Sequence, residues 1–520
     1  MTCWRGSTAC ALLVCVAAIV PYARSLDNYF VQDDFGVVWL LGQKPWSYFP
    51  RWFVSTWMDD IWGYTPDEIR PFPALTYQVS TALTPASPAA DHVMNVALHA
   101  ANGVLVLMLA WRAARLPLPA ATVTALIFIV LPMHAETVAW VTGRVDSLPA
   151  FFYLASFLAY VRWRARPGTG RLYWSSVALF FVALFSKQNA ITLAPALLLY
   201  DTIVERRTVR VSWASVAPYL PFAILTLGYL GLRYALFGEV ARESQLTAAN
   251  LSTFGDLVVR HLHRTVFGAV DVARPWHWIV VAATVVVLLA RAPRVALFFG
   301  VLWYAIGIAP VLVAAYDSPR HVYLASVGWA VLWGLGFDML RQLHRGGRFA
   351  ALALAALGMG AYSVQLARTA AEWEARSQVS ARAVAGLERE ALAASPGSLL
   401  VAGAPVSSWE WAAPFVLRPP FVDPAVGGRV TMVTPWLVDC CRAQWEHETR
   451  RRLRDWLAKG GPGEVVAMRW DRGREETFRL SSAEEPYLRS LVQVMLDTDS
   501  RTSLDRAIRT LLDRLPPARR

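Results

Sequence analysis

The chain is organised around the stretch Asn28-Tyr29-Phe30-Val31-Gln32-Asp33-Asp34-Phe35. It places two adjacent carboxylates just after an apolar run, Ala9 to Tyr22. A loop rich in Trp, Tyr and Pro follows it. Neighbouring carboxylates raise each other's pKa, and a site at a membrane surface adds a desolvation cost. Such a pair suits a general base or a cation ligand. The alternative is a helix N-cap, since an aspartate ahead of residues 35–40 is a good cap.

Composition indicates a polytopic membrane protein. Hydrophobic residues make up 56% of the 520 residues, charged residues make up 17%, and the mean hydropathy is +0.36. Soluble domains are nearer 45–50% apolar and carry more charge.

The net charge of +12 does not indicate nucleic-acid binding. Lys44, Lys187 and Lys459 are the only lysines, and many of the arginines form short clusters between apolar runs. This is the positive-inside pattern of membrane proteins rather than a stripe that follows phosphates. The five cysteines, including Cys440-Cys441, give neither a metal-binding spacing nor a disulfide framework.

A spanning helix needs about 20 residues, and tilted or buried helices can be shorter. The fold class predicted is therefore mainly α, with about eleven transmembrane helices. The predicted spans are residues 8–24, 93–111, 119–133, 147–163, 172–186, 189–202, 213–235, 276–290, 295–314, 321–340 and 349–367. The first span also fits a cleaved signal peptide; a retained helix is preferred, because no convincing small-residue cleavage site precedes Asp27.

Every second loop is rich in arginine, which predicts a cytoplasmic N-terminus and an outer C-terminus. The clusters are Arg112 and Arg115; Arg162, Arg164, Arg166 and Arg171; Arg206, Arg207 and Arg210; Arg291 and Arg294; and Arg341, Arg345 and Arg348. The alternation requires residues 172–202 to cross twice, with a turn at residues 187–189; a re-entrant pair is the alternative. The predominance of Arg over Lys is typical of a GC-rich bacterial genome, and the expected location is a bacterial cytoplasmic membrane.

Two domains are predicted. Residues 1–371 form a transmembrane catalytic domain with long outer loops at 25–91 and 237–275, and residues 372–520 form a small soluble α+β domain outside the membrane. Ser47–Met58 and Leu251–Phe267 within the outer loops have the pattern of amphipathic helices lying on the membrane. The C-terminal domain is predicted to contain helices near 381–394, 440–458, 484–497 and 502–514, and strands at 399–401, 429–433, 464–470 and 477–480, the last two paired as a hairpin.

A second polar cluster, His134, Glu136, Arg144 and Asp146, falls at the outer end of the third predicted span. Its structural alternative is a helix cap by Asp146 and an ion pair between Arg144 and Glu136. Lys187 lies between two apolar runs, where an ionisable residue is a functional candidate by default. The alternative for Lys187 is snorkelling to the outer headgroups.

Two further groups lie on the predicted outer side. Arg320, His321 and Tyr323 stand at the entrance of the tenth predicted span, where an anionic partner would explain the cations; an ion pair with Asp317 is the alternative. Arg70 comes before a helical face that carries His92, Asn95 and His99. Asn95 and His99 are predicted to join helices rather than to bind substrate.

Acids thus come first in the chain and cations later, all on the outer side. Transfer from a lipid-linked phosphate needs this arrangement. A polyprenyl phosphate leaves without a proton but needs positive charge from Arg320, Lys187 or Arg144. The attacking hydroxyl needs a base or a metal ion at Asp33 or Asp34.

Several stretches together resemble GT-C glycosyltransferases, above all the membrane part of the transmembrane and tetratricopeptide-repeat O-mannosyltransferases. The stretches are residues 28–35, Arg70-Pro71, 92–99, 132–138, 143–146, 186–188 and 320–323, within a likeness over residues 1–378 that includes Arg368 and Trp373. The resemblance implies an integral-membrane inverting transferase whose donor is a polyprenyl-phosphate sugar. It also implies that Asp33 or Asp34 deprotonates the acceptor hydroxyl or helps to bind a cation, so a divalent cation stays open as a cofactor.

Two features depart from that family. The tetratricopeptide repeats are absent, which leaves a lipid, glycan or protein hydroxyl as the acceptor. Gln188 also stands after Lys187 where the family pattern has Glu. Two other functions compete with the leading one: a ligase or polymerase that uses a polyprenyl-diphosphate glycan, and a secondary transporter. Transporters carry ionisable groups near the midplane and often show internal repeats, whereas the charges here gather at outer helix ends.

Overall fold

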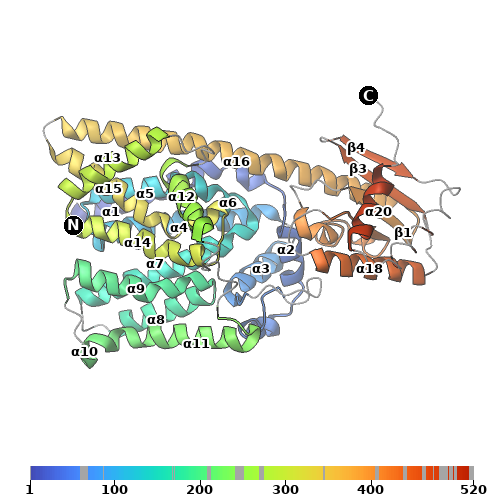
Figure 1. Ribbon diagram of the computed structural model, residues 1–520, viewed down its shortest axis with the longest axis horizontal. Helices are drawn as coiled ribbons and strands as arrows, with labels where there is room; N and C mark the ends of the chain where they lie inside the picture. The colour runs from blue at the N-terminus through green and yellow to red at the C-terminus, as the bar shows by residue number, and fades with distance from the viewer. Residues whose placement is uncertain are drawn as a thin grey trace.

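The computed structural model shows a helical bundle followed by a small region with a β-sheet (Figure 1). The structure describes residues 2–58, 68–85, 87–166, 168, 170–207, 212–240, 251–268, 275–343, 346–403, 409–436, 442–459, 464–471, 474–479, 490, 493, 496 and 501–513. Cys440-Cys441 and most of the helix predicted at 484–497 lie outside these residues.

Each predicted span corresponds to helical structure. The helices are α1 (Thr2–Ile19), α4 (Pro88–Arg112), α5 (Leu118–Val130), α7 (Arg144–Ala165), α8 (Gly170–Leu184), α9 (Leu193–Leu199), α11 (Leu220–Phe237), α13 (Pro275–Arg291), α14 (Arg294–Val313), α15 (Ser326–Leu343) and α16 (Gly347–Ala393). Proline occupies the first turn of α4, α5 and α11, where its missing N–H would have no partner in the helix anyway. Helix α15 begins later than predicted, because Pro319–Val322 forms a 3-10 helix first.

Four stretches in the described part of the chain are long and apolar enough to cross a membrane alone: α4, Ala217–Phe237, α14 and α16. A fifth results if α5 and Pro132–Ala139, which meet at a bend of 51°, count as one span. The prediction of a mainly helical protein with several apolar helices is therefore confirmed, and the number eleven stays a prediction.

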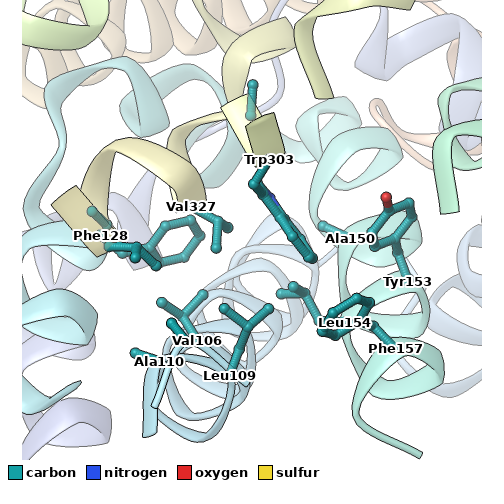
Figure 2. Close-up of a cluster of buried hydrophobic side chains, with 14 of the residues drawn as sticks. Val106, Leu109, Ala110, Phe128, Ala150, Tyr153, Leu154, Phe157, Trp303 and Val327 are labelled. Atoms are coloured by element: carbon teal, nitrogen blue, oxygen red, sulfur yellow. The ribbon is translucent and has the colours of Figure 1, made fainter. Parts of the chain in front are cut away.

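Helices α4, α5, α7, α14 and α15 enclose the largest apolar core. Figure 2 shows its centre, where Trp303 points toward Leu154 and Phe157 of α7. The rings of Phe157 and Trp303 meet edge to face with centroids 5.0 Å apart. The Trp303 indole N–H donates to the Leu324 carbonyl at 3.1 Å, so this buried polar atom is satisfied.

The segment between the two arginine-rich loops at 162–171 and 206–210 forms two helices rather than one. Helix α8 ends at Leu184, a 3-10 helix (Gln188–Thr192) follows, and α9 continues into a π-helical turn (Tyr200–Val204). The break falls at Lys187, as the sequence predicts. The double crossing of the membrane stays a prediction, with a re-entrant pair as its alternative.

The loops predicted to lie outside the membrane contain further elements. Helices α2 (Asp34–Gly42), α3 (Pro71–Leu83) and α6 (Ala135–Ala139) lie in or next to these loops, and α12 has the predicted bounds, Leu251–Phe267. The helix predicted at 47–58 is a shorter 3-10 helix, Trp46–Phe53. Pro50 lies inside it and cannot donate the backbone hydrogen bond that an α-helix needs there.

The C-terminal region contains a four-stranded sheet in the order β2-β1-β3-β4. Its elements are β1 (Ser398–Gly403), β2 (Val430–Val433), α18 (Arg442–Ala458), β3 (Val465–Asp471), β4 (Arg474–Arg479) and α20 (Arg501–Asp513). Leu400 pairs in parallel with Met432 on one side and Val466 on the other, and β3 and β4 pair antiparallel through Ala467 and Phe478. The predicted α+β character and the hairpin are confirmed.

Helix α16 corrects one prediction. The span at 349–367 and the helix at 381–394 are parts of one helix of 47 residues, which leaves the bundle and reaches the sheet region (Figure 1). The intervening residues are charged enough to end an apolar run, yet they contain no Gly or Pro and are rich in good helix formers. The boundary predicted at 371 falls inside this helix, and the division into two domains stays a prediction.

Candidate active site

Asp33 and Asp34 occupy different environments at the start of α2. Asp34 is fully buried; its Oδ1 accepts hydrogen bonds from the Thr142 N–H (2.9 Å) and hydroxyl (2.6 Å), and its Oδ2 accepts one from the Val31 N–H (3.0 Å). Asp33 is half-buried and its side chain does not cap α2, so the capping alternative fails for it. The residue before it, Gln32, has a φ of +50°, a left-handed conformation that non-glycine residues rarely adopt outside functional turns.

Burial sets the protonation of Asp34. It raises the pKa of this carboxyl from 3.8 to about 7, although the hydrogen bonds from Thr142 and Val31 act in the lowering direction. Any cation that the acidic pair binds would therefore depend on Asp33, because both oxygens of Asp34 already accept hydrogen bonds. Among the described residues, no group of three or more His, Cys, Asp and Glu side chains could hold a metal ion.

A tight turn brings Thr142 to Asp34. The turn, Val141–Gly143, follows α6 and precedes α7. A Cβ on Gly143 would lie 2.6 Å from the carbonyl oxygens of both Glu136 and Thr137, so only glycine fits between the two elements. The same turn places Asp146 in the first turn of α7, where it is not the N-cap that the sequence analysis considered.

Two cations and two acids form the centre of the site. Lys187 makes an ion pair with Asp146, and its Nζ lies 3.4 Å from Nδ1 of His321. Arg320 lies between two carboxylates, with Nε 3.6 Å from Oε1 of Glu136 and 3.8 Å from Oδ2 of Asp146. The side chain of Lys187 is 3% exposed, so it does not snorkel to headgroups. Removing Lys187 or Asp146 would leave the other residue as an uncompensated buried charge.

Arg320 connects this centre with Asp33. Burial by itself lowers the pKa of Arg320, but Asp146, Glu136 and Asp33 outweigh burial and raise that pKa above its usual value. Asp33 therefore lies within electrostatic reach of Arg320. Neither Nε of Arg320 nor Oδ2 of Asp146 has a hydrogen-bond partner, so both retain the capacity to bind a polar group.

Arg70 stands at the edge of this centre. Its guanidinium donates to Glu68 at 2.6 Å and lies over the Trp57 ring, while its charge acts on Lys187 and His321. The structure thus brings together six of the predicted residues, which we call the charged centre: Arg70, Glu136, Asp146, Lys187, Arg320 and His321.

Arg144 does not join the charged centre. Its fully buried guanidinium donates to Asp91 at 2.5 Å and to Asn95 at 3.2 Å, and it lies over the Tyr77 ring. The alternative ion pair with Glu136 is therefore not formed. Arg320 likewise does not pair with Asp317, which binds Arg260 and Arg264 instead.

His134 and Tyr323 lie deeper, in a buried cluster of polar aromatic residues. The Tyr323 hydroxyl is 2.8 Å from Nδ1 of His99 and accepts from Asn102, and His134 Nε2 is 3.0 Å from the Ser326 hydroxyl. Asn95 is buried as well and donates to the Trp140 carbonyl at 2.7 Å. The prediction that Asn95 and His99 join helices is thus confirmed.

Three polar residues of the site were not singled out from the sequence. Thr142 holds Asp34, Glu68 holds Arg70, and the Ser318 hydroxyl donates to both oxygens of Glu136 at 2.7 and 2.6 Å. Ser318 lies two residues before Arg320, and Thr142 lies two residues before Arg144. Closeness in sequence to these predicted site residues was the only signal that could have identified them. Glu68 precedes Arg70 by two residues.

A cavity of about 470 Å³ adjoins the charged centre. Its lining comes from the stretch before Asp33, from the start of α6, from α12 and from α16. The lining residues are Gln32, Pro132, Met133, Glu136, Val259, Arg260, His263, Arg264, Gly268, Ser318, Pro319, Thr369, Glu372, Trp373 and Arg376. Because Glu136 lines the cavity and also contacts Arg320, a small polar molecule in the cavity would lie next to the charged centre.

Curated relatives match part of the chain. No family model matches it. Human protein O-mannosyl-transferase TMTC1 is 31% identical over 218 residues, 38% of this chain and 24% of TMTC1. Human TMTC4 is 31% identical over 222 residues, 37% of this chain and 29% of TMTC4. The chain thus spans about a quarter of the length of these relatives, a smaller likeness than the motifs suggested for residues 1–378.

Solved structures match nearly the whole chain. The crystal structure of ArnT from Cupriavidus metallidurans bound to undecaprenyl phosphate superposes with a TM-score of 0.55 at 15% identity, and the match covers 91% of this chain and 98% of ArnT. The apo form gives 0.53 at 13% identity, with 92% and 98% covered. At this identity the likeness shows a shared fold, and the predicted GT-C-like fold is confirmed.

Proposed function

We propose that this chain is an integral-membrane glycosyltransferase. It moves a sugar from a polyprenyl-phosphate donor to a hydroxyl of a lipid, glycan or protein acceptor on the outer face of the membrane. The fold it shares with ArnT, which was crystallised with undecaprenyl phosphate, supports a lipid-phosphate donor. The partial similarity to the O-mannosyl-transferases supports a sugar as the group transferred.

One observation carries this proposal: Arg320 lies 3.6 Å from Glu136, and Glu136 lines a cavity of about 470 Å³. Gln32, the residue before Asp33, lines the same cavity. Arg320, Lys187 and Arg70 supply positive charge for the donor phosphate. Asp146 and Glu136 hold two of these cations in place before the substrate arrives, so little reorganisation is needed as the phosphate leaves.

The reaction breaks the bond between the anomeric carbon and the phosphate oxygen and forms a bond between that carbon and the acceptor oxygen. Asp33 accepts the proton of the acceptor hydroxyl as the new bond forms. The polyprenyl phosphate departs as an anion held by the charged centre and needs no proton. Attack from the face opposite the phosphate inverts the anomeric configuration.

The orientation follows from the arginine clusters. The arginine-rich loops are cytoplasmic, the N-terminus is cytoplasmic, and the charged centre and the C-terminal region face the outside of a bacterial cytoplasmic membrane. The donor enters from the surrounding lipid, and membrane lipids contact the apolar helices.

The test compares three aspartate variants in purified protein supplied with radiolabelled polyprenyl-phosphate sugars. Asp33→Asn removes the proposed base and should lower transfer by about 100-fold or more. Asp34→Asn should lower transfer less, through displacement of Asp33. Asp27→Asn, an exposed acid in the same stretch, is the matched control and should retain wild-type transfer.

Two further arms separate the alternatives. A polyprenyl-diphosphate glycan in place of the monophosphate sugar tests the ligase reaction, and a chelator tests whether a divalent cation takes part at Asp33. Full transfer by Asp33→Asn from a monophosphate donor would refute the proposed base. Transfer from the diphosphate alone would refute the proposed donor.

A further inference from the structure

Arg320 is in contact with a stack of aromatic rings that leads away from the charged centre. Its guanidinium carbon lies 4.7 Å from the centre of the Trp140 ring. Trp140 stacks on Trp373 of α16, with centroids 5.8 Å apart and planes 19° from parallel. The guanidinium of Arg376, one helical turn further along α16, lies 5.0 Å from the Trp373 ring. These four side chains form a continuous series with two tryptophans between two arginines, which we call the Arg–Trp stack.

The two tryptophans of the Arg–Trp stack are buried, and Trp140 is anchored by a hydrogen bond. Trp140 is 4% exposed and Trp373 is 6% exposed, so water competes little with their contacts. The Trp140 N–H donates to the Val31 carbonyl at 3.4 Å, two residues before Asp33. Trp140 therefore contacts two parts of the site: the segment that carries the proposed base, Asp33, and the guanidinium of Arg320.

Among the described residues, the other contacts of the Arg320 guanidinium are two ion pairs without a hydrogen bond. Its ion pairs with Glu136 and Asp146 are long, 3.6 and 3.8 Å, and its Nε has no hydrogen-bond partner. A flexible side chain held only by long ion pairs keeps several rotamers. A cation–π contact with a buried ring restricts the guanidinium to one plane while its N–H groups remain able to donate.

We propose that Trp373 and Trp140 are positioning residues, which fix the guanidinium of Arg320 for the departing phosphate. This inference rests on the proposed function. It gives α16 a role beyond spanning the membrane: its Trp373 supports the Trp140 ring, and that ring contacts the guanidinium of Arg320. Arg376 extends the Arg–Trp stack on the far side of Trp373.

The first experiment is a double-mutant cycle on donor kinetics. Trp373→Ala removes the ring on which Trp140 stacks and should raise the KM for the donor by about 3- to 10-fold, the factor expected for a lost aromatic pair, while kcat changes less. Trp373→Phe retains a ring and should recover most of the loss. In an Arg320→Gln background, Trp373→Ala should have no further effect beyond about 2-fold, because the group that it positions is gone. Equal effects in both backgrounds would overturn the proposal.

The second experiment needs no turnover. Phenylglyoxal modifies accessible arginines, and peptide mass spectrometry can follow the rate at Arg320 and, as a reference, at Arg341. The Arg320 side chain is 21% exposed and that of Arg341 is 36% exposed. Trp373→Ala should speed modification of Arg320 by about 3-fold or more at an unchanged rate for Arg341, because the Trp140 ring beneath the guanidinium loses its stacking partner. Trp174→Ala, the loss of an exposed tryptophan on α8, is the matched control and should change neither rate.

An unchanged rate at Arg320 in Trp373→Ala would overturn the positioning role whatever the enzyme transfers. If no polyprenyl-phosphate sugar is turned over but the rate at Arg320 rises as expected, the proposed function fails and the positioning role stands.

Discussion

At the scale of single residues, the two neighbouring aspartates have the same side chain but differ in burial and in hydrogen-bond partners. Asp34 faces inward and binds Thr142 and Val31, while Asp33 remains half-buried and acts on Arg320. A pair that reads as one acidic motif in sequence thus divides into a structural acid and a candidate base. No sequence pattern could assign these roles, because the assignment depends on a partner 108 positions away.

Stability should depend on pH through Asp34. Its pKa rises from 3.8 to about 7 on folding, so the folded chain binds this proton more tightly than the unfolded chain does. The contribution is fully present below about pH 4 and is lost as the pH rises toward about 7. In detergent, we expect the free energy of unfolding of wild type to fall over this range by on the order of 2 kcal/mol more than that of Asp34→Asn.

Asp27→Asn provides the control for that comparison and should keep the wild-type pH dependence, because Asp27 is exposed. Chemical denaturation at pH 4.5 and pH 7.5 would measure the difference. Parallel curves for wild type and Asp34→Asn would contradict the raised pKa.

At the scale of elements, short irregular turns do the positioning. The 3-10 helices Val141–Gly143 and Pro319–Val322 bring Thr142 and Arg320 to the site. The first lies between two predicted spans, and the second overlaps the predicted start of a span. Hydropathy located all the long helices because apolar runs decide them. It could not foresee turns whose geometry comes from close packing, nor the continuity of α16, whose charged residues 368–380 carry no helix-ending signal.

Gly143→Ala should disrupt the turn after α6. Its new methyl group would lie 2.6 Å from two backbone carbonyl oxygens, which cannot move independently of α6. We expect destabilisation of about 1–3 kcal/mol, the usual cost of overpacking, together with a loss of transfer as Thr142 shifts from Asp34.

Gly231→Ala is the matched control, because a Cβ at Gly231 meets nothing within 4 Å inside α11. It should be neutral or slightly stabilising, as expected for alanine in a helix interior. Thermal unfolding of both variants in detergent measures the comparison. Equal unfolding temperatures would show that the turn tolerates the methyl group.

At the scale of the whole molecule, the helices of the bundle run along its long axis, and the C-terminal sheet lies beyond one end of them (Figure 1). Contacts join that region to the acidic stretch. Ser377 accepts from the Tyr29 N–H at 2.5 Å, Ser380 donates to the Phe30 carbonyl at 2.7 Å, and the Trp409 N–H donates to Ser380 at 2.9 Å. The sequence predicted a separate outer domain, and it could not reveal the contacts of Tyr29 and Phe30 with α16 because they join residues about 350 positions apart.

Site-directed labelling can test the proposed orientation. In a background without cysteines, Lys459→Cys in the C-terminal region should react with a membrane-impermeant maleimide added to intact cells. Arg207→Cys, in an arginine-rich loop, should react only after the cells are opened. Labelling of residue 207 from outside would reverse the orientation and place the charged centre on the cytoplasmic side.

Helix α16 has one more consequence, which concerns rotation. Trp373, Ser377 and Ser380 recur at intervals of four and three residues and so share one side of an unbroken rod. Deleting a single residue between the bundle and Trp373 would turn everything beyond it by about 100°, swinging all three away from their partners at once. The rotational setting of α16 therefore determines where the backbone of Tyr29 and Phe30, just before the two aspartates, is held.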